Sequence, residues 1–115
     1  MRELEHPAVR ELTLDGVLSA LADPVRRRIV HKLARRSAWD GWRELPCLAL
    51  DLPVSKSTAT HHFRVLREAG LIQQRREGTA ILNSLRHRDL EDRFPGLLPA
   101  IIRAHDQDPD SPADE

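Results

Sequence analysis

Hydrophobic residues in the first third of the chain repeat with the spacing of a helix. Four of them fall at i, i+3, i+4 and i+7 and predict a short helix after a lead-in of residues 1–12: Leu14, Val17, Leu18 and Leu21. A second helix is predicted over residues 24–36, because Asp23 can cap its first turn and proline is tolerated at its first position. The apolar stripe of this second helix consists of Val25, Ile29 and Leu33.

The stretch between residues 37 and 70 predicts a loop, a short helical piece and a longer helix. Gly41 and its polar neighbours predict the loop over residues 37–45. The short helical piece is predicted over residues 46–50 and ends before Pro53, which disfavours helix at the residue preceding it. Ser55 is a good N-cap, and Gly70 a good C-terminal stop, for a helix over residues 56–69.

The pattern changes to that of strands after this helix. The residues LIQQRREGTAILNSLR predict two short strands, and Gly78 between them can take the positive φ that a tight hairpin turn needs. A last helical region is predicted from about Asp89, interrupted by Pro95-Gly96 and continued by an apolar stripe of Leu97, Leu98, Ile101 and Ile102. This order of elements predicts a mainly α winged helix-turn-helix domain with a small β-hairpin.

The length of 115 residues corresponds to one domain. We expect the lead-in over residues 1–12, the domain over residues 13–105 and an acidic, disordered tail over residues 106–115. No apolar run approaches the roughly 20 residues that cross a bilayer, and the charged N-terminus has no signal-peptide apolar region. Cys47 is the single cysteine, so no intrachain disulfide can form. A cytoplasmic protein without membrane contact is expected.

The formal net charge of zero, which alone argues against a nucleic-acid partner, hides a segregation of charge. Residues 56–88 hold seven basic and two acidic residues, whereas residues 106–115 hold five acidic residues and no basic one. The whole-chain value therefore averages a basic segment against an acidic tail. The basic excess either marks a solvated face or attracts an anionic partner.

The helix predicted over residues 56–69 has two chemically different faces. One face carries Ala59, His62, Phe63 and Leu66 and is expected to pack inward. The opposite face carries Ser57, Thr60, His61, Arg64 and Glu68. Hydroxyl and imidazole groups can donate or accept hydrogen bonds, and arginine can contact guanine or phosphate, so this face suits base edges and the phosphates beside them.

Each of these residues also has a purely structural interpretation. Ser55 is more often only a helix cap, and His62 is expected to be a core histidine with a hydrogen-bond partner. His61, taken alone, would be a solvated surface histidine. Arg75 and Arg76, just before the hairpin turn, are placed to reach phosphates or a minor groove, or else they end a solvated strand.

The segments LADPVRRRIVHKLA and VSKSTATHHFRVLREAGLIQQRREGTAILNSLR resemble the ArsR/SmtB-type winged-helix transcriptional repressors. The resemblance implies a homodimer that binds double-stranded DNA. It places the helix over residues 56–69 in the major groove, the wing over residues 73–84 on flanking DNA, and the N- and C-terminal helices at the dimer interface. The residues then expected to contact DNA are Lys56, Ser57, Thr58, Thr60, His61, Arg64, Arg75 and Arg76.

Metal sensing, which many members of that family perform, is poorly supported by the residues present. The family's thiol site uses two cysteines and an aspartate, whereas LPCLALDL contains Cys47 and Asp51 alone, too few donors for zinc. The second family site needs a histidine where Phe94 stands, and Pro95-Gly96 breaks its helix, although other candidate ligands exist: His87, Asp89, Asp92, His105 and Asp108. We predict no metal and no cofactor. A small-molecule, metal or redox inducer, with or without a role for Cys47, stays open.

Two further classes of function fit less well. A winged-helix module that binds protein rather than DNA would carry apolar or aromatic residues on the outward face of the helix over residues 56–69, which this chain lacks. A thiol–imidazole enzyme would have to use Cys47, His61 and His62, but the two histidines lie on different helix faces. The sequence therefore predicts a DNA-binding transcriptional regulator, with repression favoured, and not an enzyme.

Overall fold

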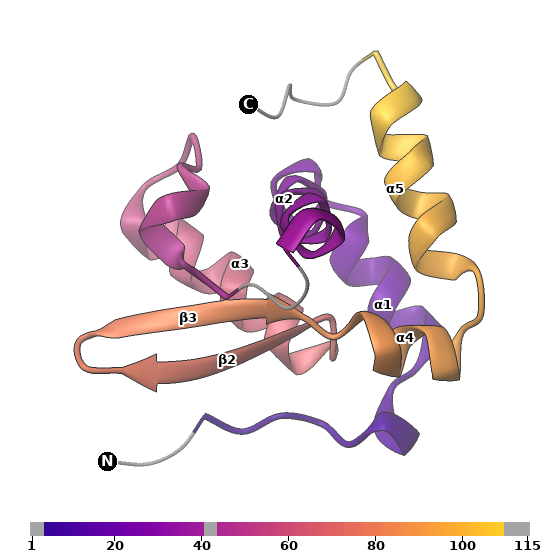
Figure 1. Ribbon diagram of the computed structural model, residues 1–115, viewed down its shortest axis with the longest axis horizontal. Coiled ribbons are helices and arrows are strands. Elements are labelled where there is room, and N and C mark those ends of the chain that lie inside the picture. Colours follow the sequence, from indigo (N-terminus) through magenta and orange to yellow (C-terminus); the bar gives the residue numbers. More distant parts are fainter. Residues whose placement is uncertain (1–3, 41–43, 110–115) are drawn as a thin grey trace.

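Helices α2 and α3 pack against a small sheet in the computed structural model, which describes residues 4–40 and 44–109 (Figure 1). Part of the predicted acidic tail, residues 110–115, lies outside the described residues. In chain order, the elements are η1 (Val9–Glu11), α1 (Leu14–Leu21), α2 (Pro24–Asp40), β1 (Leu45–Pro46), η2 (Cys47–Leu50), α3 (Lys56–Glu68), β2 (Ile72–Glu77), β3 (Ala80–Leu85), α4 (His87–Arg93) and α5 (Leu97–Gln107). The predicted winged helix-turn-helix fold is confirmed.

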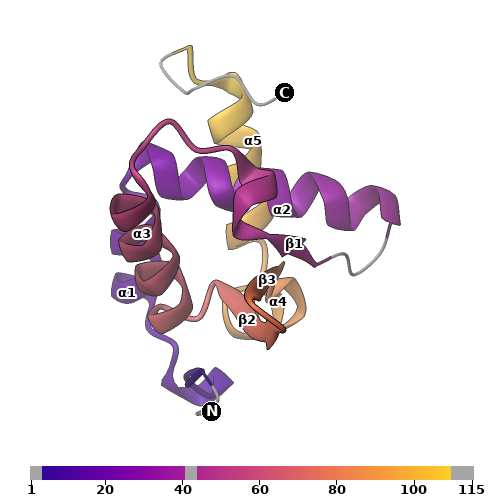
Figure 2. The same cartoon turned by 90° about the vertical axis from the view of Figure 1, so that its left-hand side faces the viewer.

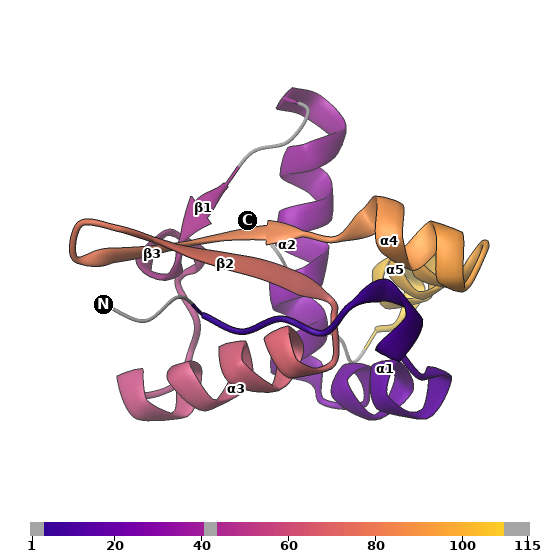
Figure 3. The ribbon, with the colours of Figure 1, turned by 90° about the horizontal axis from the view of Figure 1, so that it is seen from below.

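The sheet is antiparallel with the strand order β1-β3-β2. Strands β2 and β3 pair from Ile72 opposite Leu85 to Glu77 opposite Ala80, which forms the predicted hairpin, or wing. Gly78 takes a φ of +60° in the turn, as the prediction requires. The wing projects to one end of the molecule, and the N-terminal end of α3 lies at that same end (Figure 3).

The predictions for residues 37–50 were partly wrong. Helix α2 continues to Asp40. Leu45, predicted to end the loop, and Pro46, predicted to begin the short helical piece, form strand β1 instead. The short helical piece is the 3-10 turn Cys47–Leu50. Leu45 pairs with Asn83 of β3, and the Asn83 side-chain amide also donates to the Leu45 carbonyl at 3.1 Å. Since these partners are 38 positions apart in the chain, no local pattern predicts the strand.

The hydrophobic core lies where α1, α2 and α3 meet the sheet. Figure 2 shows α2 running across the domain with α1 and α3 against it. Phe63 and Leu66 of α3 are buried, as the inward-face prediction requires, and Ala59 is half-buried. The other fully buried core side chains include Ile29, Leu33, Leu50, Leu71, Ile72 and Leu85.

The apolar stripe predicted for α1 divides into two parts. Val17 and Leu21 are buried in the core, whereas Leu14 and Leu18 each expose 45% of their surface. The predicted helix is confirmed as α1, and only half of its apolar stripe is buried within the single chain. Leu14 and Leu18 remain an unburied apolar strip on α1.

Two arginines of α2 bind the C-terminal end of α1 and so hold α1 against the domain. Arg26 Nε donates to the Ala20 carbonyl at 2.6 Å, and Arg27 Nη1 donates to the Leu21 carbonyl at 2.8 Å. Carbonyls in the last turn of a helix have no partner within the helix, so cationic donors there satisfy them. Part of the basic character of α2 is therefore structural.

The segment before α1 packs against the domain. Leu12 is buried beside Gly70, and its carbonyl accepts from Arg93 Nε at 3.1 Å. Arg86 Nη1 donates to the Pro7 carbonyl at 2.9 Å. The boundary between lead-in and domain stays a prediction, but these contacts tie residues 7–12 to the end of α3 and to α4.

Candidate nucleic-acid interface

The N-terminal turn of α3 is fixed by hydroxyl groups. Ser55 has extended backbone angles, and its Oγ accepts from the Thr58 backbone N–H at 3.2 Å, as an N-cap does. The same hydroxyl donates to Thr58 Oγ1 at 3.0 Å and lies 3.3 Å from Ser57 Oγ. This cap orients the first turn of α3, whose side chains at Lys56, Ser57 and Thr58 are all exposed.

The next turns of α3 expose the remaining predicted contacts of this helix. Thr60 Oγ1 donates to the Lys56 carbonyl at 2.9 Å, so its oxygen lone pairs stay available to a donor on a ligand. Arg64 Nη2 lies 3.2 Å from His61 Nδ1. A guanidinium can only donate, so Nδ1 accepts and a neutral His61 ring carries its proton on Nε2. The pair therefore presents N–H donors to the solvent side of α3.

His62 occupies the opposite face and holds α3 against α2. Its Nδ1 lies 3.3 Å from Arg26 Nη1, and Arg26 in turn binds the end of α1. Burial lowers the pKa of His62, because it disfavours the charged ring; Arg26 and His61 lower it further, against an opposing effect of Asp23. The expectation of a core histidine with a partner is confirmed.

The two wing arginines have different surroundings. Arg75 Nε and Nη2 donate to the Glu44 carboxylate, each at 2.7 Å from one of its oxygens, and Arg75 Nη1 also pairs with Glu77. These carboxylates raise the pKa of Arg75. Arg76 is exposed, and within the described part of the chain no hydrogen bond or ion pair of its side chain is found. Of the two wing arginines, Arg75 is therefore neutralised by carboxylates, whereas Arg76 keeps its full positive charge at the surface of the wing.

A polar chain of hydrogen bonds, partly buried, joins α3, the wing and η2, and we did not predict it from the sequence. Arg67 Nη1 donates to Gln74 Oε1 at 2.8 Å, and Gln74 Nε2 donates to Asn83 Oδ1 at 2.7 Å. Asn83 Nδ2 then donates to Cys47 Sγ at 3.2 Å. The signal was present in the sequence: alternation puts Gln74 on the buried side of its strand with Ile72, where a polar side chain needs a partner.

The lead-in adds one more contact to this chain of bonds. The Gln74 backbone N–H donates to His6 Nε2 at 2.9 Å. Burial is the main cause that lowers the pKa of His6, and the nearby charges of Arg67 and Arg86 act in the same direction. A neutral His6 can accept this bond, and a protonated one cannot.

The residues considered as metal ligands do not come together. Among the described residues, no group of three or more His, Cys, Asp or Glu side chains is arranged to hold a metal ion. Asp89 accepts from Arg86 Nε at 3.0 Å. The ring of His105 lies against that of His31, tilted by 37° with 4.8 Å between centroids. None of the described helices has both the length and the apolar composition that a membrane crossing demands.

Comparison with known proteins agrees with this geometry. Residues 21–75 match the family described as "Helix-turn-helix domain". The chain is 31% identical over 87 residues to the uncharacterized HTH-type transcriptional regulator YceK of Bacillus subtilis, covering 74% of this chain and 82% of that protein. It is 29% identical over 85 residues to the transcriptional repressor SdpR of Bacillus subtilis, covering 74% of this chain and 89% of that protein.

A solved structure gives the same result. An ArsR-like transcriptional regulator from Rhodococcus sp. RHA1 matches with a TM-score of 0.56 and 26% identity, over 82% of this chain and 83% of that chain. The fold and the exposed polar face of α3 define a winged helix-turn-helix DNA-binding protein. The chain belongs to the ArsR/SmtB-type family of transcriptional regulators.

Proposed function

We propose that the protein is a homodimeric repressor that inserts α3 of each subunit into a major groove and lays its wing on the flanking DNA. The observation that carries the proposal is the outward face of α3, where hydroxyl, imidazole and guanidinium groups are all exposed while Phe63 and Leu66 anchor the opposite face. The proposal places the protein on DNA in the cytoplasm and gives it no catalytic role.

The contacts divide by position on α3. Lys56, Ser57 and Thr58 lie at the helix N-terminus, where charge and free N–H groups favour a backbone phosphate. Thr60, His61 and Arg64 lie further along the exposed face and are assigned to base edges. On the wing, Arg76 contacts a flanking phosphate, whereas Arg75 contributes mainly by tying the wing to Glu44.

The second subunit is proposed to cover apolar side chains at the end of the molecule opposite the wing tip. Helices α1 and α5 both lie there (Figures 1 and 3). Leu14 and Leu18 of α1 are exposed, and Leu97 and Ile101 of α5 are half-buried. Covering these four side chains would remove apolar surface from water and leave the outward face of α3 open.

A DNA-binding assay on the promoter of the protein's own gene tests the assignment. Replacing His61 or Arg64 with alanine is expected to weaken binding by about 1–3 kcal/mol each, because a base contact is lost. Arg88→Ala is the matched control, since Arg88 is exposed on α4, away from the wing tip. Unchanged affinity in both α3 variants, with the dimer intact, would show that this face is not the reading surface.

A further inference from the structure

One histidine joins the lead-in to the outer edge of the wing. His6 Nε2 accepts from the Gln74 backbone N–H at 2.9 Å. The strand order β1-β3-β2 leaves β2 at the edge of the sheet, where outward N–H groups have no neighbouring strand among those described. Figure 3 shows the lead-in running along β2, from η1 toward the end of the molecule that carries the wing tip. His6 therefore satisfies a backbone donor that would otherwise need water.

The residues that follow His6 are held by contacts of a different kind. The Pro7 carbonyl accepts from Arg86 Nη1 at 2.9 Å, and the Leu12 carbonyl accepts from Arg93 Nε at 3.1 Å. Leu12 itself is buried in the core. Arginine stays protonated at every pH at which proteins fold, whereas a histidine changes its charge between about pH 5 and pH 8. Of these three hydrogen bonds, only the one at His6 therefore depends on pH.

The charged groups that act on His6 are both positive. They are Arg67 of α3 and Arg86 at the N-cap of α4. The nearby carboxylate of Asp89 already accepts from Arg86 Nε at 3.0 Å. Strand β2 contributes the uncharged Gln74, whose side-chain oxygen accepts from Arg67 Nη1 at 2.8 Å. A proton on His6 therefore adds a third positive charge to this part of the molecule.

Protonation also removes the acceptor on which the contact depends. A neutral ring that accepts at Nε2 carries its proton on Nδ1, whereas a charged ring has an N–H at both nitrogens and turns a donor toward the Gln74 N–H. Burial is the largest cause that lowers the pKa of His6 from its ordinary value of 6.5. A hydrogen bond to the Leu4 backbone opposes this shift, and the two arginines add to it. The neutral ring is therefore the form that fits the folded protein.

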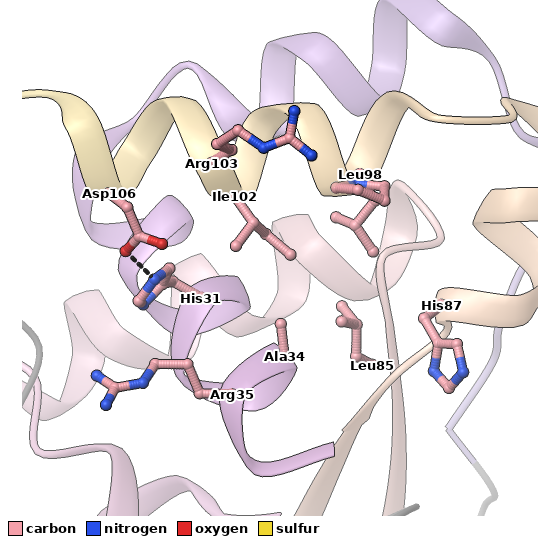
Figure 4. A pocket seen from close by; sticks show the side chains of 10 residues that line it. His31, Ala34, Arg35, Leu85, His87, Leu98, Ile102, Arg103 and Asp106 are labelled. Atoms are coloured by element: carbon pink, nitrogen blue, oxygen red, sulfur yellow. Dashed lines mark hydrogen bonds and ion pairs between the residues drawn. The ribbon is translucent and has the colours of Figure 1, made fainter. Parts of the chain in front are cut away.

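The histidine contact between α2 and α5 responds differently to acid. His31 Nε2 lies 2.5 Å from Asp106 Oδ1 (Figure 4). A carboxylate accepts from a neutral ring or from a charged one, so protonation of His31 keeps this bond. Acid therefore breaks the contact of His6 without breaking the one that joins α5 to α2.

We propose that His6 is a pH-sensitive switch, whose neutral ring holds residues 4–6 on β2 and whose protonated ring releases them while residues 7–12 stay bound. The released residues lie beside the wing, so acid changes the surface next to the proposed DNA contacts. That consequence rests on the proposed function, but the switch itself does not.

NMR relaxation measurements on the isotope-labelled full chain, without DNA, test the switch. At about pH 7.5 the Leu4 and Glu5 amides should be rigid, with order parameters of about 0.85, and at about pH 5 these values should fall below about 0.6. The amide of Val30, a core residue of α2, should stay rigid at both pH values, which shows that the fold persists. The ring nitrogen signals of His6 should show the tautomer protonated on Nδ1 at the higher pH.

Three variants separate the switch from general loosening of the chain. His6→Gln supplies an amide oxygen in place of Nε2 and cannot titrate, so residues 4 and 5 should stay rigid at both pH values. His6→Ala removes the acceptor, and these residues should be mobile at both. His61→Gln, which removes an exposed histidine on the outward face of α3, is the matched control and should behave like the parent.

Two outcomes would overturn the proposal. In the first, Leu4 and Glu5 of the parent are equally rigid at both pH values. In the second, they lose their order in His6→Gln between the same pH values as in the parent. Since no DNA is present, either outcome is distinct from a failure of the proposed DNA binding.

Discussion

His61 and His62 are adjacent in the chain and have opposite surroundings. His61 is exposed beside Arg64, whereas His62 is 8% exposed and contacts Arg26. One residue of helix rotates a side chain by about 100°, enough to move it from the solvent to the core. The same imidazole group is therefore a candidate reader of DNA at one position and an anchor of the fold at the next.

The buried histidine makes stability depend on pH. The pKa of His62 is lowered from 6.5 in the folded protein, so below about pH 6.5 the unfolded chain binds more protons than the folded one. The free energy of unfolding should therefore decrease as the pH falls from about 7.5 to about 5.5. Urea unfolding across this range should show a smaller decrease in His62→Gln, whose amide oxygen can still accept from Arg26. Thr60→Ala, an exposed change on the same helix that removes no titratable group, is the matched control and should keep the parent's slope.

Phe63 provides a second test at the residue scale. Its ring is 4% exposed in the core, so Phe63→Ala should lower the free energy of unfolding by about 3–5 kcal/mol. Thr60→Ala, on the exposed side of the same helix, should change it by about 0.5 kcal/mol or less. Chemical denaturation measures both, and equal effects would contradict the assignment of the two helix faces.

At the scale of elements, one glycine ends helix α3 and another forms the turn of the wing, and the two positions require glycine for different reasons. Both have positive φ, +86° at Gly70 after α3 and +60° at Gly78 in the wing turn. A Cβ on Gly70 would lie 2.0 Å from Leu12 Cδ2, whereas one on Gly78 would meet nothing within 4 Å. Gly70 therefore serves both the turn and the close packing of the lead-in, and Gly78 serves only the turn.

Alanine substitutions should separate these two roles. Gly78→Ala is expected to cost about 1–2 kcal/mol of folding stability, from the left-handed backbone alone. Gly70→Ala should cost about 2–5 kcal/mol, because Leu12 must also move within a packed core. Thermal and urea denaturation of the two variants measure the difference, and an equal loss would show that Leu12 adapts without cost.

The wing arginines give a test of the DNA contacts at this scale. Arg76→Gln should weaken binding to all duplexes similarly and reduce the slope of log affinity against log salt by about 1, because a phosphate contact is removed. Arg88→Gln should leave the slope unchanged. Titrations at several salt concentrations measure it, and an unaltered slope for Arg76→Gln would place the wing away from the phosphates.

At the scale of the whole molecule, the apolar surface on α1 predicts self-association. Leu18→Glu puts a charge into the proposed interface and should shift the protein from dimer to monomer, with weaker DNA binding because two linked recognition helices become one. Ser19→Glu adds the same charge to an exposed neighbour pointing elsewhere on α1 and should remain dimeric. Sedimentation equilibrium distinguishes the two states, and a dimeric Leu18→Glu protein would contradict the proposed interface.

Local pattern alone determined most of the helices, the wing and the two faces of α3. These features depend on the spacing of neighbouring residues, on caps such as Ser55 and on glycines at turns, all of which lie within a few positions of one another. The family resemblance could be recognised for the same reason, because the segment from α3 to the wing is continuous in the chain.

Only the tertiary structure decided the features that join distant positions. Strand β1 exists because Leu45 meets Asn83, Arg75 is neutralised because Glu44 lies beside it, and the polar chain from Arg67 ends at Cys47. The contact between His31 of α2 and Asp106 of α5 likewise joins residues 75 positions apart. Periodicity indicates which face of an element is buried, but the partner that buries it is set by how the elements pack in three dimensions.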